Sequence, residues 1–394
     1  MKLSNVTIKK NIKVGIDAAN LRGGGGVTHL VELLRATEPD VMGIEGIIVC
    51  GGTVTLNLID DRPWIKKCFI AELDRGLLRR TIWQRFSLSK VARQENCDVL
   101  FVPGGSYAGS FSPMVTMSRN LLPFETKELG RYGLSFSTIK LLILRCTQSY
   151  SYKHAQAVIF LTKYAFKVVS NWTGTIKGLT CVIPHGLNPR FFNPPKLQRH
   201  ISNYGIANPY RIIYVSTIDQ YKHQWHVIEA IDSLRKSGMH IALDLIGSYY
   251  PPALKRLKSS IAQYDPQGNW VSYLESVPFN DLHSYYSHAD LGLFASSCEN
   301  MPNILLETMA SGLPIAASNR GPMPEILGSA GVYFDPEKPS EIARALSELI
   351  NSPHLRADLS KASYDCAIKY SWHLCARKTY QFMIDVTQGY KGTT

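Results

Sequence analysis

The stretch ADLGLFASSCENMPNILLETMASGLPIAAS, residues 289–318, decides the fold of this chain. Its apolar run at 291–294 predicts a buried strand, and the small polar residues at 296–300 predict a loop at the carboxyl end of that strand. A helix is expected to begin at Pro302 and to end before Gly312, and the apolar run at 313–317 predicts a second strand. A strand, a helix and a strand in this order imply a parallel sheet.

Two carboxylates in this stretch predict a ligand site. Glu299 lies in the loop before the helix, and Glu307 follows on its second turn. Because a helix N-terminus carries unpaired N–H groups and partial positive charge, it suits a phosphate. Glu307 is placed to reach a ribose diol beside that phosphate, and Glu299 a sugar beyond it. The alternative is that Glu307 is an exposed helix residue and that Glu299 stands near the helix start because acids are favoured there. Phosphate contacts are expected at the helix start, from Met301, Pro302, Asn303 and Ile304.

The Glu-x7-Glu spacing, within CENMPNILLETMASG and followed by LPIAAS and RGPMPE, resembles the donor-site signature of the family-four retaining glycosyltransferases. The resemblance covers most of residues 180–375 and extends more weakly over the N-terminal half. It implies an α/β protein of the GT-B architecture, in which two Rossmann-like domains with parallel sheets face each other across a cleft. It also implies that Glu299 is the catalytic residue that contacts the transferred sugar and that Glu307 holds the ribose.

The length of 394 residues suggests two domains. We expect an N-terminal, acceptor-side domain at 1–192 and a nucleotide-sugar donor domain at 210–372. Residues 193–209 are rich in Pro and Asn and predict a linker. The segment at about 373–394 is similar to the family's tail helix, which packs back on the first domain.

The charge is uneven along the chain. Residues 1–200 hold 27 Lys+Arg and 13 Asp+Glu, a balance of +14, whereas residues 201–394 hold 16 and 18, a balance of −2. A basic half could face anionic lipid, a phosphorylated acceptor or nucleic acid. The glutamate pair argues against a nucleic-acid partner, so we expect none.

Cysteine usage and hydropathy predict a cytoplasmic protein. The eight cysteines are scattered, without a Cys-x-x-Cys pair or zinc-ligand spacing, which is typical of reduced thiols. The first 15 residues lack the apolar core of a signal peptide, and no apolar run reaches 18 residues. A location at the inner face of the membrane stays open.

A glycine-rich loop, LRGGGG at 21–26, follows the strand predicted at 12–18 and precedes a helix. The backbone at Gly24 and Gly25 can approach a phosphate closely, although a flexible turn is the alternative. The loop does not match Gly-x-Gly-x-x-Gly in register, and no acid is well placed for a dinucleotide ribose, which disfavours NAD. We expect no cofactor. In the resembled family this loop faces the donor across the cleft.

Nine basic residues lie between Arg62 and Arg93. Within 74–94, apolar residues fall mostly on one helical face and basic residues on the others. This pattern indicates either a membrane-surface helix or a helix packed on the core with a solvated basic face, and we favour the second. Peripheral contact with an anionic membrane is the corresponding partner hypothesis.

The resemblance also assigns weaker candidates. Where the family often has a His-Asp pair, this chain has Arg119 and Asn120. Neither is a plausible general base, which fits a retaining mechanism in which the leaving phosphate takes the acceptor proton. We interpret Arg119 as a contact for an anion or acceptor, or as a loop cap. Lys222 aligns with a lysine that contacts the diphosphate, and Thr217 stands where the family has an arginine, so it can donate only one hydrogen bond.

Metal is not expected, because no Asp-x-Asp occurs in the sequence and cationic or helix-dipole contacts can neutralise the leaving phosphates. The leading hypothesis is a retaining, metal-independent glycosyltransferase. It would move a sugar from a nucleotide diphosphate sugar to a carbohydrate or lipid-linked hydroxyl in bacterial lipopolysaccharide or surface polysaccharide synthesis. The alternatives are a nucleotide-sugar 2-epimerase and a non-catalytic nucleotide-sugar binding protein.

Overall fold

The computed structural model describes residues 11–391 and divides them into two compact units. Unit 1 comprises residues up to 124, residues 139–186 and residues from 372, and unit 2 comprises residues 125–138 and 187–371. The predicted N-terminal domain included residues 125–138, which the structure places in unit 2. Residues 1–10 and 392–394 lie outside the described residues. The predicted first domain and the signal-peptide argument include the first of these ranges, and the predicted tail helix includes the second.

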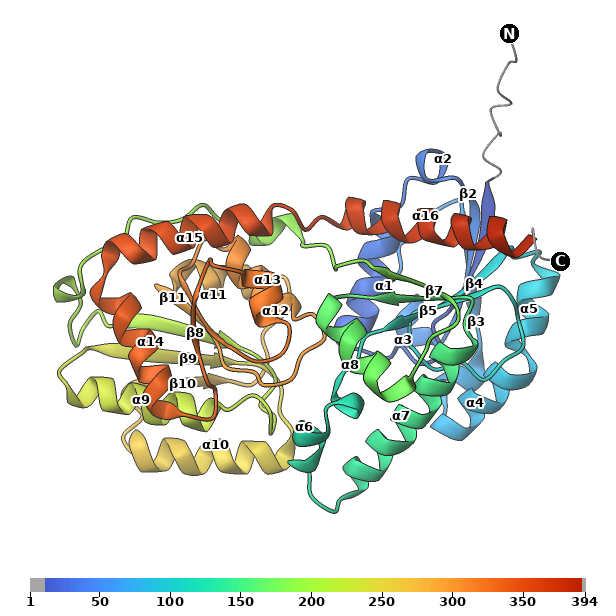
Figure 1. Ribbon diagram of the computed structural model, residues 1–394. Coiled ribbons are helices and arrows are strands. Elements are labelled where there is room, and N and C mark those ends of the chain that lie inside the picture. The colour runs from blue at the N-terminus through green and yellow to red at the C-terminus, as the bar shows by residue number, and fades with distance from the viewer. Residues whose placement is uncertain (1–10, 392–394) are drawn as a thin grey trace, which may run out of the picture. The chain divides into compact units, whose positions relative to one another are not determined.

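Unit 1 is built on a parallel sheet of seven strands within the described range (Figure 1). The strand order is β3-β2-β1-β4-β5-β6-β7, so the order reverses between β1 and β4. The strands are β1 (Ile12–Asp17), β2 (Ile44–Gly51), β3 (Ile65–Phe69), β4 (Val99–Val102), β5 (Met114–Ser118), β6 (Ala157–Phe160) and β7 (Leu179–Val182).

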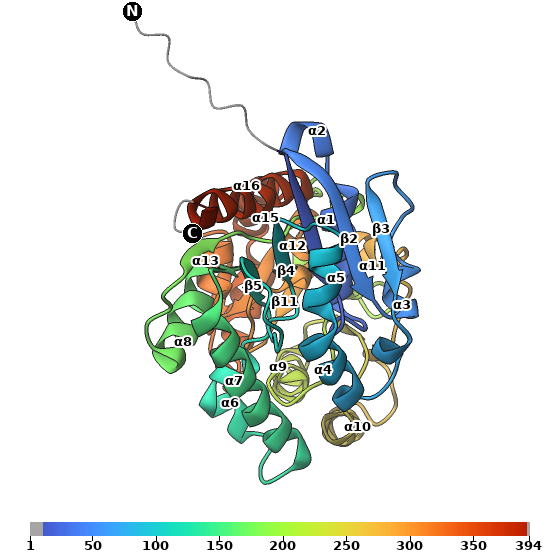
Figure 2. The same cartoon turned by 90° about the vertical axis from the view of Figure 1, so that its right-hand side faces the viewer.

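Helices cover both faces of this sheet, and α16 runs beside α1 and α2 (Figures 1 and 2). Gly186 permits the chain to approach the start of α16, because a Cβ there would lie 2.2 Å from the Trp372 backbone nitrogen. The helices are α1 (Gly25–Arg35), α2 (Pro39–Met42), α3 (Thr53–Leu56), η1 (Ala71–Asp74), α4 (Leu77–Phe86), α5 (Leu88–Gln94), η2 (Leu122–Phe124), α7 (Phe136–His154, of which 136–138 belong to unit 2), α8 (Lys163–Thr173) and α16 (Trp372–Lys391).

Unit 2 repeats the design with six described strands in the order β10-β9-β8-β11-β12-β13, all paired in parallel. Here the order reverses between β8 and β11. The strands are β8 (Tyr210–Val215), β9 (Ile241–Ile246), β10 (Val271–Leu274), β11 (Leu291–Phe294), β12 (Ile315–Ser318) and β13 (Val332–Phe334).

The helices of unit 2 include α6, which comes from the inserted segment 125–138. The predicted linker, residues 193–209, also lies in unit 2, where the Tyr204 hydroxyl donates to Asp290 at 2.9 Å. The helices are α6 (Thr126–Gly130), η3 (Pro189–Phe191), η4 (Ile201–Asn203), α9 (Gln224–Lys236), α10 (Pro251–Tyr264), α11 (Leu282–His288), α12 (Asn303–Ala310), α13 (Met323–Leu327), α14 (Pro339–Asn351) and α15 (Pro353–Ala367).

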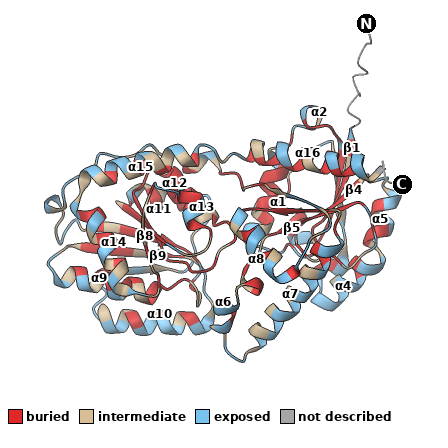
Figure 3. Cartoon of the chain, in the orientation of Figure 1, coloured by how far each residue is buried: buried red, intermediate tan, exposed pale blue. Residues whose placement is uncertain are grey.

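The two sheets carry the cores, as the buried strands of Figure 3 show. All four residues of β11 are buried, which is expected of a parallel strand covered on both faces. The fold class predicted from residues 289–318 is therefore confirmed: both units are α/β with Rossmann-like parallel sheets. The strand predicted at 291–294 has these bounds, and the helix and second strand differ from prediction by one or two residues at each end.

The basic segment at 62–93 contains strand β3, and the helix that we expected within 74–94 is divided into α4 and α5. Leu88 and Ala92 of α5 are buried, as expected of a helix packed on the core. Trp83 is buried, but the apolar residues Leu77, Leu78, Ile82 and Phe86 of α4 are at least half exposed. The apolar face thus points largely to solvent. No helix within residues 11–391 is long and apolar enough to cross a membrane.

Candidate functional site

The candidate site lies at the carboxyl ends of β8 and β11, the two neighbouring strands of unit 2 between which the strand order reverses. The loop after β8 carries Thr217 and Lys222, and the loop after β11 carries Glu299. Because successive connections leave such a point toward opposite sides, the loops diverge and leave a crevice where open α/β sheets bind ligands. The topology therefore brings together residues that are 77 positions apart.

Lys222 and Glu299 form an ion pair through Nζ and Oε1. Only 6% of the Lys222 side chain and 15% of the Glu299 side chain are exposed. The ammonium also lies 5.1 Å from the ring centre of Tyr221 and 5.5 Å from that of Phe294, within the range of cation–π attraction. Removing one partner of such a shielded pair would leave a buried charge uncompensated.

The helix that follows Glu299 presents its N-terminus at the same edge. Pro302 is the N-cap residue of α12, no side chain caps the helix, and its first turn contains no acid. Met301 and Pro302 are buried, whereas Asn303 and Ile304 are half-buried. Asn303 Oδ1 is buried without a hydrogen-bond partner. This end keeps its dipole charge and a free acceptor, which suits a phosphate-bearing ligand with donor groups.

Glu307 is buried on α12, and its Oε2 atom has no hydrogen-bond partner. Burial raises the pKa of Glu307 to about 8, although Tyr286 and Arg190 act in the opposite direction. The prediction that Glu307 could simply be an exposed helix residue is wrong. A buried carboxyl oxygen without a partner is costly, so a hydroxyl from a ligand would relieve the cost.

Thr217 differs from Lys222 in its exposure to solvent. It is exposed, and its hydroxyl lies 3.4 Å from Ser248 Oγ in the loop after β9. Gly247 makes this close approach of the loops feasible, because its φ of 149° lies in a region that favours glycine and a Cβ would lie 2.2 Å from the Ser216 carbonyl oxygen. Thr217 can donate a hydrogen bond, but nothing here replaces the charge of an arginine.

Unit 1 holds the remaining predicted residues at the carboxyl ends of β1 and β5. Gly24, with φ of 63°, is the N-cap of α1, Gly25 is its first residue, and both are exposed. Arg119 lies against this loop, since a Cβ on Gly26 would be 3.1 Å from its Nη1 atom. Burial lowers the pKa of Arg119 to about 10, so the guanidinium stays charged at neutral pH. Asn120 instead accepts a hydrogen bond from the Leu122 backbone at 3.1 Å and shapes a turn.

A pair of buried histidines, His29 and His185, lies in the same unit. Their Nδ1 atoms are 2.9 Å apart. Burial lowers the pKa of both imidazoles, that of His185 to about 3, so both are neutral and one donates to the other. The nearby Arg119 cation lowers both pKa values further. This pair gives Arg119 a neutral surrounding instead of an acidic partner.

Residues that sequence reasoning missed complete the neighbourhood of the glutamates. They are Tyr286 and Arg190 around Glu307, and Ser297, His223 and Glu128 behind the Lys222–Glu299 pair. None carries a motif, and Glu128 is 169 positions from Ser297. Within residues 11–391, no group of three or more His, Cys, Asp or Glu side chains could hold a metal ion. All eight cysteines are free thiols.

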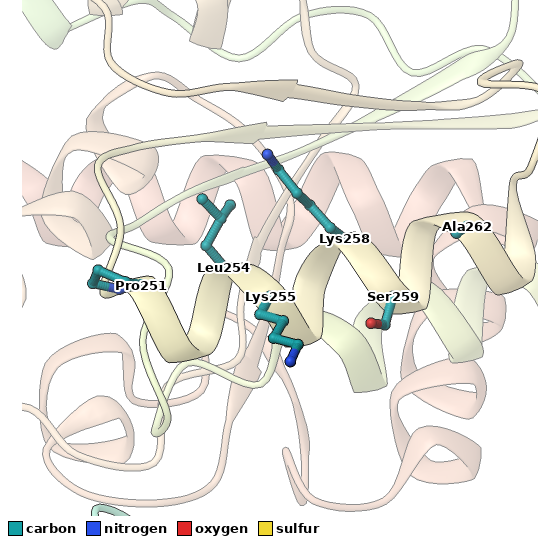
Figure 4. A pocket seen from close by; sticks show the side chains of 6 residues that line it. All are labelled: Pro251, Leu254, Lys255, Lys258, Ser259 and Ala262. Atoms are coloured by element: carbon teal, nitrogen blue, oxygen red, sulfur yellow. The ribbon is translucent and has the colours of Figure 1, made fainter.

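A surface hollow lies elsewhere in unit 2. Figure 4 shows that its lining comes from one helix, α10, with Leu254, Lys255 and Lys258 among the residues that line it. None of the predicted site residues contributes to it. We therefore assign the candidate site to the loops after β8 and β11 and not to this hollow.

Comparison with known proteins finds a family model that matches part of unit 2. Residues 198–365 match the family model described as "Glycosyl transferases group 1". The match includes Thr217, Lys222, Glu299 and Glu307.

Curated relatives match over part of their length. O-antigen chain mannosyltransferase B of Escherichia coli is 24% identical over 188 residues, covering 48% of this chain and 49% of that protein. The GDP-mannose-dependent alpha-(1-6)-phosphatidylinositol monomannoside mannosyltransferase of Mycolicibacterium smegmatis is 24% identical over 232 residues, covering 55% and 59%. The chain thus spans about half the length of the curated relatives it matches.

Solved structures match over the whole chain. Sucrose-phosphate synthase from Thermosynechococcus elongatus superposes with a TM-score of 0.76 at 15% identity, covering 96% of this chain and 100% of that one. Anabaena HepE in complex with UDP-glucose gives a TM-score of 0.68 at 15% identity, with 96% and 100% coverage. At this identity the likeness shows the fold, which is GT-B.

Proposed function

We propose that this protein is a retaining glycosyltransferase of family four that moves a sugar from a nucleotide diphosphate sugar to a hydroxyl acceptor. The observation that carries the proposal is the grouping at one strand reversal of unit 2. There, the Lys222–Glu299 pair, the uncapped start of α12 and the buried Glu307 lie within a group 1 glycosyltransferase domain.

In the proposed reaction, the bond between the sugar's anomeric carbon and the leaving phosphate oxygen breaks, and a bond to the acceptor oxygen forms on the same face. The acceptor's proton passes to the leaving phosphate. Glu299 stabilises the positive charge that develops on the sugar, and Lys222 together with the α12 N-terminus stabilises the negative charge on the diphosphate. The Lys222 ammonium has three N–H donors, so it can bind phosphate and Glu299 at once.

Glu307 is the proposed ribose contact. Its pKa of about 8 means that the free protein holds it mostly protonated at neutral pH. A ribose diol donates two hydroxyl protons, which favours the ionised carboxylate. Nucleotide binding should therefore release a proton near pH 7, and affinity should rise as the pH approaches 8. Calorimetry in buffers of different ionisation enthalpy measures this release, and its absence would remove Glu307 from the ribose.

In unit 1, we propose that the α1 N-terminus at Gly24 and Gly25, together with Arg119, binds an anionic group of the donor or acceptor. The backbone N–H groups and the charged, half-buried Arg119 support this role. The turn made by Asn120 makes it a weaker candidate for acceptor contact.

The activities named for the relatives support a carbohydrate or lipid-linked acceptor and a role in bacterial surface polysaccharide or lipopolysaccharide synthesis. We propose a cytoplasmic location with peripheral contact at an anionic membrane. Leu78, Ile82 and Phe86 on α4 recur every four residues and are 74%, 50% and 64% exposed. Exposed arginines lie beside this stripe, and Figure 3 shows much of α4 exposed. An apolar stripe among cations fits the surface of an anionic bilayer.

The test is a panel of UDP- and GDP-sugars with candidate acceptors, scored first by thermal shift. A ligand that binds the folded state raises the melting temperature by mass action. The product is then identified by mass spectrometry and NMR. A glycoside with the donor's anomeric configuration supports the proposal. Inversion at C2 of the donor's sugar, without transfer to an acceptor, indicates the epimerase, and binding without turnover indicates a binding protein.

A further inference from the structure

The segment 126–132, here called the α6 segment, lies in unit 2 although the chain on both sides of residues 125–138 belongs to unit 1. Its polar side chains contact the loops that follow β8, β11 and β13. Tyr132 contacts the first loop, Glu128 the second, and Lys127 and Arg131 the third. A short segment thus joins three loops at the carboxyl edge of one sheet.

The contact made by Glu128 reaches both loops of the candidate site. Ser297 Oγ donates to Glu128 Oε2 at 2.6 Å, and His223 Nε2 lies 2.9 Å from Ser297 Oγ. Since an ionised carboxylate only accepts, the serine hydroxyl donates to Glu128 and accepts from an Nε2–H tautomer of His223. Burial lowers the pKa of His223 to about 3, consistent with a neutral ring.

This chain of hydrogen bonds ends beside the two proposed active residues. His223 follows Lys222 directly, and Ser297 precedes Glu299 by two positions. The backbones of the two loops are also joined, because the Ser297 N–H donates to the Tyr221 carbonyl oxygen at 2.9 Å. The backbone of His223 has a φ of 55°, a left-handed conformation that is costly for a residue other than glycine. The surrounding structure therefore holds His223 in this conformation.

The other contacts fix the α6 segment itself. Arg131 Nε donates to Glu128 Oε2 at 2.6 Å, and Arg131 and Lys127 both pair with Glu337. Burial alone would raise the pKa of Glu337, but these two cations lower it to about 2. The Tyr132 hydroxyl donates to Asp219 Oδ1 at 2.7 Å. Glu128 is therefore itself held in place, and its side chain is only 5% exposed.

We propose that Glu128 is a positioning residue for sugar transfer. Through Glu128, the α6 segment keeps the loops that carry Lys222 and Glu299 in fixed positions relative to each other. This inference rests on the proposed function. Glu128 touches neither proposed active residue. It acts through Ser297 and His223. Without Glu128, the one acceptor left for the Ser297 hydroxyl proton among the described residues is the Tyr221 carbonyl oxygen, 3.3 Å away in the opposite loop.

The first test needs no substrate. Hydrogen exchange is compared in the full chain for wild type, Glu128→Ala, Glu128→Gln and the control Glu229→Ala, which removes an exposed glutamate of α9. Glu128→Ala should speed exchange about tenfold or more in peptides covering 216–224 and 296–300 and leave β9 and α14 unchanged. Glu128→Gln keeps one acceptor oxygen for Ser297 and should be intermediate. Unchanged loops, or faster exchange across all of unit 2, would overturn the proposal.

The second test separates positioning from general stability. Glu128→Ala should lower kcat about tenfold to a hundredfold, the range expected for losing a buried charge-assisted hydrogen bond. Affinity for the nucleoside monophosphate should stay unchanged, because Glu307 lies outside this network. Equal loss of both, or normal kcat, would refute the role. If wild type transfers no sugar, the proposed function fails, while the exchange result still decides whether Glu128 orders the loops.

Discussion

Glu307→Gln should stabilise the ligand-free protein at neutral pH. Glutamine keeps the shape of a protonated glutamic acid but cannot ionise. In the folded state burial raises the pKa of Glu307 to about 8, whereas the unfolded chain titrates near the ordinary value of 4.5. Between these values the folded state holds a proton that the unfolded state has released, so the wild-type protein loses stability as the pH rises through this window.

The size of the effect follows from the two pKa values. Their difference, from 4.5 to about 8, corresponds to about 5 kcal/mol. Wild type and Glu307→Gln should have similar stability at pH 4, below both pKa values. The variant should then gain on wild type up to about pH 8, and the gap should be constant above it.

The assay is denaturant unfolding at a series of pH values, with unit 2 followed by hydrogen exchange of β8 and β11 peptides. The difference between the two proteins at each pH cancels the titration of every other group. Glu229→Gln, an exposed change in the same unit, serves as the control and should show no trend. A gap between Glu307→Gln and wild type that does not change with pH would refute the buried, protonated carboxyl and the proton release that it predicts for nucleotide binding.

The remaining predictions concern the donor, the metal and the membrane. Glu307→Ala should weaken nucleotide binding roughly tenfold to a hundredfold and raise KM more than it lowers kcat, since the ribose contact exists in ground and transition states alike; normal nucleotide affinity in calorimetry would contradict this. Transfer should survive EDTA, and a complete loss restored by Mg²⁺ or Mn²⁺ would contradict a site neutralised by Lys222 and α12. Binding to anionic vesicles should fall with salt, because exposed charges are screened over about 10 Å at 0.1 M. It should also fall in a Leu78→Ser, Ile82→Ser, Phe86→Ser triple variant, whereas equal binding to neutral vesicles would rule out the charge contribution.

The sequence allowed the sheet and the two glutamates to be predicted, for local reasons. The run at Leu291–Phe294 is fully buried, and such a strand is apolar at every position, so its bounds are visible in the sequence. Pro302 marks the start of the helix because its ring restricts the backbone. Gly312 marks the end because glycine permits backbone conformations that other residues disfavour. Glu299 and Glu307 are assigned from the family resemblance of this stretch, because their spacing alone leaves the alternative of exposed acids open.

The surroundings of those residues could not be predicted, because they come from distant parts of the chain. The burial of Glu307 depends on α12 packing with Tyr286 near it, and the pairing of Lys222 with Glu299 depends on β8 lying beside β11. The α6 segment enters unit 2 from a part of the chain that otherwise builds unit 1. Helical periodicity predicted which residues form the apolar face of α4. Periodicity does not show whether another element of the fold covers that face.

The most direct measurement of the central claim is steady-state transfer by Glu299→Gln, with nucleoside diphosphate affinity measured by calorimetry on the same protein. The change removes the charge that is proposed to stabilise the sugar and frees the shielded ammonium of Lys222. The account predicts that kcat falls by about two orders of magnitude, the range seen when one electrostatic contact to a transition state is lost. Diphosphate affinity should be retained, because Lys222 keeps its N–H donors for the phosphate. Full turnover by Glu299→Gln, with the variant folded as wild type, would contradict the account.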